Sequence, residues 1–437
     1  MRNYGRFLTQ KAPLGYLLVS LFSGLGSGFF YPLSGLFVVD ALGASPLQMG
    51  IFLSLSILSG VLVSQRIAKQ SDLGLDRRNI ILTSQMSFIV VMVLFLFIRN
   101  YYLALAVMVC ISSFSAAAMP QTFAIGREYA DKDMGNNGTL FLSLMRAMMS
   151  LSWVIGPPLA FIVKDAVGFN GAFMFAGIMM SVSVLIVWRL FPSVTIKKAE
   201  TATSVVNHSW RRIEGVPMYI AAVFMLFWAN NMYVTTIPLY VSKELIMGSA
   251  VAGQLLGLAA FVEIPVMILA GLWATRVDPQ RLMILGVTSA CLFYTLLWGA
   301  EELWQMYALQ LLNGTAVGIC AGLGMVVIQN KMSTQMGVAT TLFNNAIMVA
   351  SLISSVTVGV IAQFFDYHSV IGAMILVGLV AMLLLMLSVR EKNSLALQKR
   401  RQRCTDSTVA IAKENRELKE KRSADADLFL FLLLNEG

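Results

Sequence analysis

The sequence predicts an all-α membrane protein with twelve transmembrane helices. Of its 437 residues, 57% are hydrophobic and only 13% are charged, and the mean hydropathy is +0.74. This composition is far more apolar than that of a soluble globular chain. Twelve stretches are apolar over the length of about 20 residues that a helix needs to cross a bilayer. They are continuously apolar, without the in-out alternation of a transmembrane barrel, so helices are favoured.

Charged or turn residues separate most of the twelve stretches and set their order along the chain. The predicted spans are residues 14–39, 47–65, 80–98, 102–125, 139–163, 169–190, 217–241, 251–274, 282–299, 303–328, 338–364 and 370–389.

The distribution of Lys and Arg predicts the orientation in the membrane. The N-terminus and the loops after even-numbered spans hold 17 basic residues, against 3 in the loops after odd-numbered spans. Basic residues accumulate on the cytoplasmic side, so we expect both termini in the cytoplasm. The net charge of +9 then reflects topology and a basic tail, and does not indicate a nucleic-acid partner.

The longest internal connection divides the chain into two halves of six spans. We therefore expect an N-terminal six-helix bundle in residues 1–191, a cytoplasmic linker in 192–216, a C-terminal six-helix bundle in 217–390 and a charged tail in 391–437. The loop after the second span of each half carries an acidic residue followed by arginine, Asp72 with Arg77 in the first and Asp278 with Arg281 in the second. This repetition indicates two pseudo-symmetric bundles.

Two ionisable residues lie deep inside predicted spans. Arg146 is in the fifth span and Glu263 is in the eighth, just before Pro265. A charge in hydrocarbon costs at least about 2.5 kcal/mol, so each needs a structural or functional reason. A carboxyl group in a medium of low dielectric can take up a proton, whereas arginine stays charged and acts as a donor or charge partner. We predict proton coupling by Glu263 with Arg146; a structural ion pair between helices is the alternative.

Proline and glycine interrupt the fifth span. Gly156, Pro157 and Pro158 are consecutive, and each proline removes a backbone donor and crowds the preceding turn, so the helix is predicted to break and bend here. Ser152 and Gly156 form a pair of small residues that lets a second helix approach closely. We assign Gly156 and Pro157 to gating.

Uncharged polar and aromatic side chains also lie inside the spans. The candidates for binding a substrate are Gln121, Trp153, Asn230, Asn231, Tyr233, Asn313 and Asn345. Amides both donate and accept hydrogen bonds, as sugar hydroxyls do, and aromatic rings offer flat faces to a sugar ring. Each residue alone is also typical of a contact between helices or an interface anchor.

The loop after the second span is a candidate gate. Asp72 stands near a predicted helix end, with Arg77 five residues later. An acidic group paired with a basic one can hold one conformational state and break in another. The alternative is ordinary positive charge on the cytoplasmic side.

Twelve spans as six plus six, with this loop after the second span, resemble the major facilitator superfamily. Several stretches are similar to bacterial sugar efflux transporters, a group of proton-coupled exporters: Ser150 through Ala160, Leu62-Val63-Ser64-Gln65, Glu263-Ile264-Pro265, Gln310-Leu311-Leu312-Asn313 and Ala339-Thr340-Thr341-Leu342. The resemblance covers residues 14–389. It departs after Gln329, where the family has an acidic residue and this chain has Asn330 and Lys331, and the tail has no counterpart.

The resemblance implies a secondary active transporter that exports sugars or glycosides by proton antiport through alternating access. A multidrug antiporter of the same fold is one alternative, and a membrane sensor or scaffold whose output is the tail is another. Two histidines and four scattered cysteines provide no credible metal or catalytic site, so we expect no enzyme activity, metal or cofactor. The expected partners are a small solute, protons and lipid, and the expected state is a monomer.

Overall fold

The computed structural model describes residues 11–72, 74–134, 138–192, 210–213, 215–333 and 335–390. The regular structure in these ranges is helical throughout, as predicted. Most of the predicted linker and the whole charged tail lie outside the described residues.

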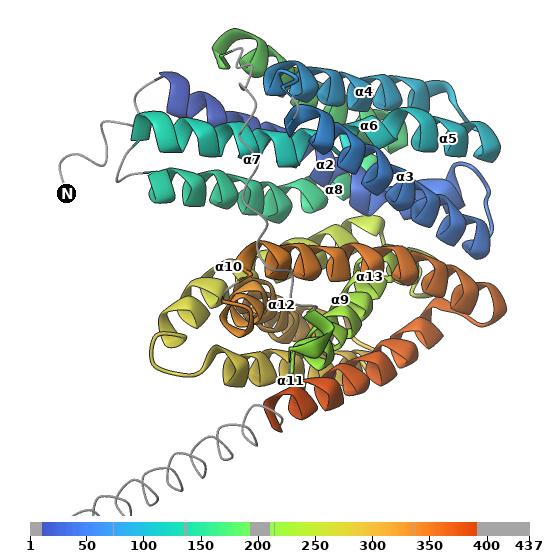
Figure 1. Cartoon of the computed structure of the whole chain (residues 1–437). Coiled ribbons are helices and arrows are strands. Elements are labelled where there is room, and N and C mark those ends of the chain that lie inside the picture. The colour runs from blue at the N-terminus through green and yellow to red at the C-terminus, as the bar shows by residue number, and fades with distance from the viewer. Residues whose placement is uncertain are drawn as a thin grey trace, which may run out of the picture.

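The N-terminal half consists of long helices that run back and forth (Figure 1). They are α2 (Lys11–Asp40), α3 (Pro46–Asp72), α4 (Arg77–Phe97), α5 (Tyr101–Val107), the π-helix η1 (Met108–Ser112), α6 (Ser113–Ser115), α7 (Ala118–Tyr129), the π-helix η2 (Ala130–Met134) and α8 (Gly138–Leu190). The segments from α5 to η2 continue one another, so they make a single pass, Tyr101–Met134.

The C-terminal half repeats this arrangement. After the short η4 (Trp210–Arg212) come α9 (Val216–Leu239), the π-helix η5 (Tyr240–Glu244), α10 (Ser249–Trp273), α11 (Pro279–Trp298), α12 (Leu303–Lys331), α13 (Met336–Phe364) and a last helix, Tyr367–Arg390. The third helix of each half begins with an aspartate cap: Asp76 accepts from Arg78 N, and Asp278 accepts from Gln280 N. The repeat therefore pairs Asp76, rather than Asp72, with Asp278.

The number of passes agrees with the prediction. Eleven helices in the described ranges are long and apolar enough to cross a membrane, and the longest, α8, contains two passes. It is interrupted at Gly168, whose φ of 81° and ψ of 179° are not helical. The break expected at Pro157 and Pro158 was predicted wrongly: both lie inside α8, and the non-helical residue is Gly168, eleven positions beyond Pro157.

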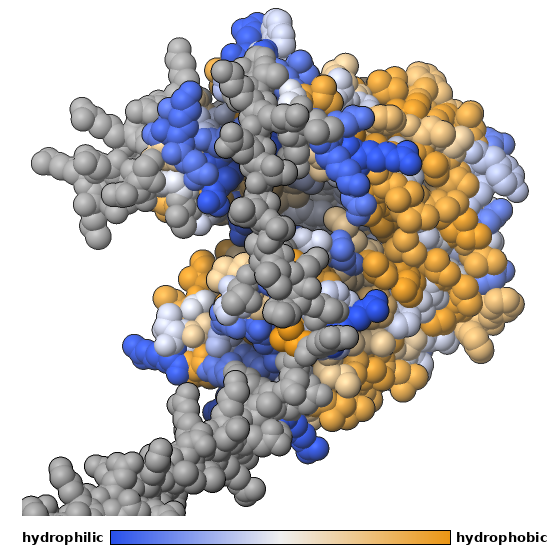
Figure 2. Space-filling model, in the orientation of Figure 1, coloured by the Kyte–Doolittle hydropathy of each residue, from blue (hydrophilic) through white to orange (hydrophobic). Residues whose placement is uncertain are grey.

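The outer surface is apolar, as a chain surrounded by lipid requires. Large hydrophobic side chains such as Phe97, Phe261 and Leu383 are exposed on the helices. Figure 2 shows hydrophobic residues covering much of the side on which the halves meet. A hydrophobic surface of this extent in a soluble monomer would lead to association, so the chain is a multi-pass membrane protein.

Among the described residues, the two halves contact each other only toward one end of the long helices. We call the end where α8 stops and α9 starts the linker end, and the opposite one, where α2 stops, the far end. At the far end, a Cβ on Gly50 of α3 would lie 2.5 Å from the carbonyl oxygen of Ser355 in α13. A Cβ on Gly257 of α10 would lie 2.3 Å from Pro158 of α8. Glycine allows these helices to meet almost backbone to backbone.

The opposite side of the molecule is open. Figure 2 shows the halves joined on the right of the view and a hollow between them toward the left. The fold thus places a cavity between the bundles, closed at the far end and facing the linker end.

Candidate functional site

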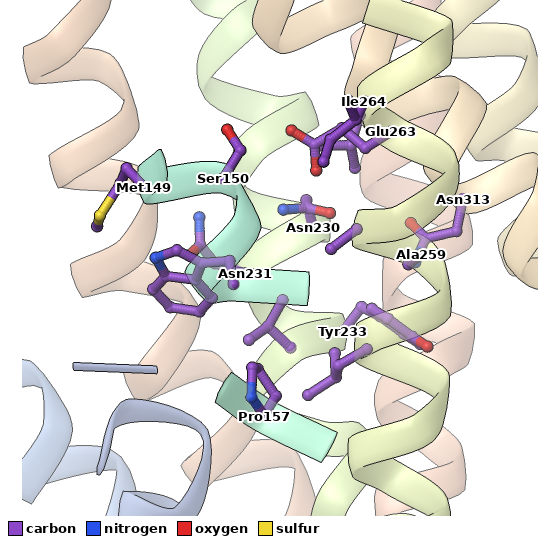
Figure 3. A pocket seen from close by; sticks show the side chains of 15 residues that line it. Met149, Ser150, Pro157, Asn230, Asn231, Tyr233, Ala259, Glu263, Ile264 and Asn313 are labelled. Carbon is purple, nitrogen blue, oxygen red and sulfur yellow. The ribbon is translucent and has the colours of Figure 1, made fainter. Parts of the chain in front are cut away.

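A cavity of about 350 Å³ lies between the halves. Its walls are formed by α8 on one side and by α9, α10 and α12 on the other. The lining residues are Met149, Ser150, Trp153, Pro157, Asn230, Asn231, Tyr233, Val234, Leu256, Ala259, Ala260, Glu263, Ile264, Asn313 and Val317. We call this space the central cavity (Figure 3).

Three asparagine side chains give the central cavity its polar character. Asn230 forms no side-chain hydrogen bond within the described ranges, and Asn231 donates through Nδ2 to the carbonyl of Phe227 at 2.7 Å. Asn313 is buried and donates through Nδ2 to Gln310 Oε1 at 3.1 Å. The Oδ1 atoms of these amides remain as acceptors, so a ligand with hydroxyl groups can be held without a charge.

Gln310 acts from behind the cavity wall. It is fully buried, and its Oε1 accepts from both Tyr233 OH and Asn313 Nδ2, each at 3.1 Å. Its Nε2 donates to the carbonyl of Met306 at 3.0 Å. These bonds fix the orientation of two lining side chains before any ligand arrives, which reduces the entropy cost of binding.

Glu263 is the one carboxylic acid among the lining residues of the central cavity. It points into the cavity from α10, on the side opposite Ser150 of α8 (Figure 3). Within the described part of the chain, its carboxyl group forms no hydrogen bond or ion pair. A carboxyl group that faces a cavity without a protein partner is free to exchange a proton with water or ligand.

Arg146 stands on the same face of α8 as the lining residues. Positions 146, 150, 153 and 157 follow one another at intervals of four, three and four, and so share one side of a helix. Ser150, Trp153 and Pro157 line the cavity, and Arg146 is exposed one turn closer to the linker end. It forms no ion pair with a described residue, so the structural ion pair weighed for Arg146 is absent from the described ranges.

Gln121 does not line the central cavity, contrary to the role expected for it. It is buried in α7 and accepts from Ser71 Oγ at 3.0 Å and from Arg77 Nη1 at 2.8 Å. Arg77 also binds Glu128 through Nε at 2.7 Å. Gln121 therefore belongs to a cluster at the linker end that ties α3, α4 and α7 together. The side chain of Asp72 lies outside the described residues.

Two further candidates, Gly156 and Asn345, do not line the central cavity. Gly156 packs against α2, where an added Cβ would lie 3.2 Å from Gly28 Cα, so the close approach predicted for it is confirmed. Asn345 is exposed on α13 and is not among the residues that line the central cavity. Ile347 and Met348, which follow it in α13, line a neighbouring space instead.

A second cavity of about 430 Å³ adjoins the first. Trp153, Asn231 and Val234 line both, and the walls of the second are mostly apolar with several serines, among them Ser351 and Ser355. The central cavity is thus the polar part of a larger space between the bundles.

The residues that the sequence analysis missed are mainly partners of those it found. Glu128 and Ser71 bind Arg77, and Ser150 faces Glu263 across the cavity. The signal for Glu128 was available, since it is the first acidic residue after the fourth predicted span begins. The pairing itself joins positions 51 residues apart, which sequence spacing does not indicate.

Comparison with known proteins agrees with this geometry. The family model of the Major Facilitator Superfamily matches residues 16–293 and 219–435. The chain belongs to the Major Facilitator Superfamily. It is 36% identical to Sugar efflux transporter A of Dickeya chrysanthemi over 364 residues, covering 83% of this chain and 92% of that one. It is 35% identical to Sugar efflux transporter A of Escherichia coli, covering 84% of this chain and 94% of that one.

The superfamily fold is also found by structural comparison. The crystal structure of the nucleoside transporter NupG matches with a TM-score of 0.70 at 12% identity, covering 87% of this chain and 99% of that one. At this identity the likeness concerns the fold alone. The predicted fold class and the resemblance to sugar efflux transporters are confirmed, and the relatives are transporters rather than enzymes.

Proposed function

We propose that this protein exports sugars or glycosides from the cytoplasm by proton antiport through alternating access. The observation that carries the proposal is the central cavity, which is lined by three uncharged amides of the C-terminal half, one aromatic ring from each half and a single carboxyl group. Relatives at 35 to 36% identity are named sugar efflux transporters, which supports the cargo class.

The proposed orientation places the linker end in the cytoplasm of a bacterium, with the protein in the inner membrane and both termini inside. The bias of 17 basic residues against 3 supports it. In this orientation the described conformation faces the cytoplasm, because the halves meet at the far end. A cytoplasmic sugar can then enter without passing a closed gate.

Each lining residue has a proposed role. Asn230, Asn231 and Asn313 hold hydroxyl groups, Trp153 covers one face of a sugar ring, and Tyr233 completes the wall. In the cavity, a sugar hydroxyl exchanges its hydrogen bond to water for one to an amide oxygen. Selectivity therefore comes from the geometry of the amides.

Glu263 and Arg146 are proposed to couple the sugar to protons. Glu263 accepts a proton when the cavity faces outside, where the proton concentration is higher, and releases it when the cavity faces the cytoplasm. Arg146 stands at the cytoplasmic mouth of the same helix face and favours the ionised carboxylate there by its field. Sugar leaves in the outward-facing state as the proton enters, so the inward proton gradient drives export.

The proposed gating elements lie on both sides of the cavity. The cluster around Arg77, with Asp72 at the end of α3, is the inner gate element of residues 1–191, and Gly156 with Pro157 forms the surface on which α8 moves. The two bundles, residues 1–191 and 217–390, rock about the cavity, the linker 192–216 joins them and the tail follows residue 390. A monomer is sufficient for this motion.

The test is a substrate panel in everted membrane vesicles that contain the protein. Energised vesicles should accumulate labelled neutral sugars and fail to do so with a protonophore. A multidrug antiporter would instead accumulate a cationic dye and ignore the sugars. Truncation after Arg390 separates a third possibility, because a scaffold that acts through its tail would lose its effect and a transporter would keep it.

A further inference from the structure

Each half contributes an equivalent loop to the far end. The loop of the N-terminal half follows α2 and spans residues 41–45, and that of the C-terminal half follows η5 and spans residues 245–248. An ion pair of 2.5 Å between Asp40 and Lys243 joins the helix ends that lead into them. The two loops therefore start from the contact between the bundles, at equivalent places in the repeat.

The backbone of the two loops follows the same path. In each loop, one N–H group bonds the carbonyl five positions back, and the N–H group two residues later bonds the carbonyl six positions back. The residue between the two donors is left-handed in both loops, with a φ of 64° at Gly43 and 53° at Ile246. The four bonds are Leu42 N to Phe37 O at 3.2 Å, Ala44 N to Val38 O at 3.1 Å, Leu245 N to Tyr240 O at 3.1 Å and Met247 N to Val241 O at 3.0 Å.

The side chain at this left-handed position differs between the halves. Gly43 has no Cβ and adopts a positive φ readily, and nothing lies within 4 Å of a Cβ placed there. Ile246 is the only residue other than glycine with a positive φ in the described ranges. In this conformation Cβ crowds the following carbonyl oxygen, and a β-branched residue rarely adopts it. The Ile246 side chain is 87% exposed, so packing does not compensate for the strain.

The helix that leads into each loop differs in the same sense. α2 is α-helical up to Asp40, whereas the last turn before the second loop is the π-helix η5. Single π-helical turns are rare and frequently lie at functional sites. Glu244, the last residue of η5, accepts from the backbone N–H groups of Tyr367 and His368, so this turn is also tied to the last helix of its own half. The irregular backbone is thus concentrated in residues 240–248, on the C-terminal side of the contact.

Bonds to the N-terminal half hold the strained segment on both sides of Ile246. Lys243, three residues before it, bonds Asp40, and the first two residues of α10 bond the carboxylate of Asp165. Backbone strain persists where the surrounding contacts enforce it, and such residues cluster at switch regions. Separation of the halves at the far end breaks the bonds on both sides and frees the segment to relax.

We propose that residues 240–248 are the part of the far-end gate that changes conformation. This segment is strained while the halves meet at the far end, and it relaxes to ordinary backbone angles when they separate. The loop after α2, with Gly43 at the equivalent position, keeps its geometry in both states. The strain raises the free energy of the closed state alone and so offsets part of the free energy lost with the bonds to Asp40 and Asp165. The inference rests on the alternating access of the proposed function, and not on its cargo.

The test measures a distance across the far end of the purified protein by pulsed electron paramagnetic resonance. Spin labels are attached through Val167→Cys and Glu301→Cys, at exposed positions of opposite halves, after the four native cysteines are replaced by serine. A short distance reports the closed far end and a long one the open far end. Ile246→Gly removes the strain from the closed state only, so we expect the ratio of long to short distances to fall about fivefold. Ile246→Asn should lower it less, because asparagine tolerates the left-handed region only in part.

The matched control is Gly43→Ile, which places the same side chain at the same backbone angles in the loop that keeps its geometry. It should lower the Tm and leave the ratio of distances unchanged. An unchanged ratio in Ile246→Gly, with only a higher Tm, would show that the strain is equal in both states and overturn the inference. A rise of the ratio in Gly43→Ile as large as the fall in Ile246→Gly would overturn it too, because both loops would then change.

The same measurement separates this inference from the proposed function. Asp165→Ala is measured alongside, since loss of its bonds to α10 should raise the open population. A single distance in every variant, Asp165→Ala included, would contradict the inference and the alternating access on which it rests. The expected fall in Ile246→Gly, in a protein that transports no sugar, would support the inference and contradict the proposed cargo.

Discussion

Asp165 accepts a hydrogen bond from Ser249 Oγ at 2.5 Å and thereby joins the two halves at the far end. Asp165 follows the first pass of α8, and Ser249 is the first residue of α10, so the aspartate caps a helix of the opposite half. A second link, between Asp40 and Lys243 at 2.5 Å, joins α2 to η5 at the same end. These contacts hold the conformation that faces the linker end.

Replacement of Asp165 by alanine should favour opening at the far end. The variant removes two bonds from α10 to a partly exposed carboxylate, from Ser249 Oγ and Ala250 N, and we expect this loss to be worth about 1 kcal/mol, or about fivefold in the equilibrium between the two conformations. A cysteine introduced at Ala260, in a variant whose four native cysteines are serine, should react faster with an impermeant thiol reagent added outside. Asp366→Ala is the control, because Asp366 bonds Ser369 N within its own half. An unchanged labelling rate in Asp165→Ala would remove this contact from the gate.

The glycine contact between α3 and α13 should tolerate no side chain. Gly50→Ala brings a methyl group against the backbone of Ser355 and should destabilise the described conformation by about 1 to 3 kcal/mol, seen as a lower Tm of the purified protein. Gly271→Ala is the matched control, since nothing lies within 4 Å of a Cβ there. If both variants melt alike, the helices are not packed as described.

Trp153 should matter for affinity, and Trp228 should not. Trp153 lines the central cavity, whereas Trp228 packs against Phe224 on α9 and does not line it. Loss of a stacking ring costs about 0.5 to 1.5 kcal/mol, so Trp153→Ala should raise the KM for sugar roughly threefold to tenfold. Trp153→Phe should recover part of that loss. Similar KM values for Trp153→Ala and Trp228→Ala would contradict the assignment of the ring face.

Substitutions at Gln121 and Asn231 should separate an effect on conformational change from an effect on sugar binding. Gln121 bonds Arg77 and Ser71 outside the cavity, so Gln121→Leu should lower the maximal transport rate and leave the KM for sugar near its original value. Asn231 lines the cavity, so Asn231→Leu should raise the KM. Initial rates over a range of sugar concentrations give the maximal rate and the KM separately. A raised KM in Gln121→Leu with a lowered maximal rate in Asn231→Leu would contradict these two roles.

Sequence patterns predict the helices and the polar wall of the cavity, and they fail where contacts join distant positions. Apolar length places the twelve passes because hydrocarbon imposes it on every span. Asn230, Asn231, Asn313 and Glu263 were expected in one site and line one cavity. Gln121 was misplaced because an embedded amide serves a buried cluster as well as a cavity. The Asp165–Ser249 bond joins positions 84 apart and leaves no trace in periodicity.

The most direct test of the account is sugar transport in proteoliposomes with an imposed pH gradient, comparing the unaltered protein with Glu263→Gln. The unaltered protein should drive labelled sugar against its concentration gradient toward the acidic side, and Glu263→Gln should still exchange sugar at equal pH but lose accumulation. Accumulation by Glu263→Gln equal to that of the unaltered protein would contradict the claim that this carboxyl group carries the coupling proton.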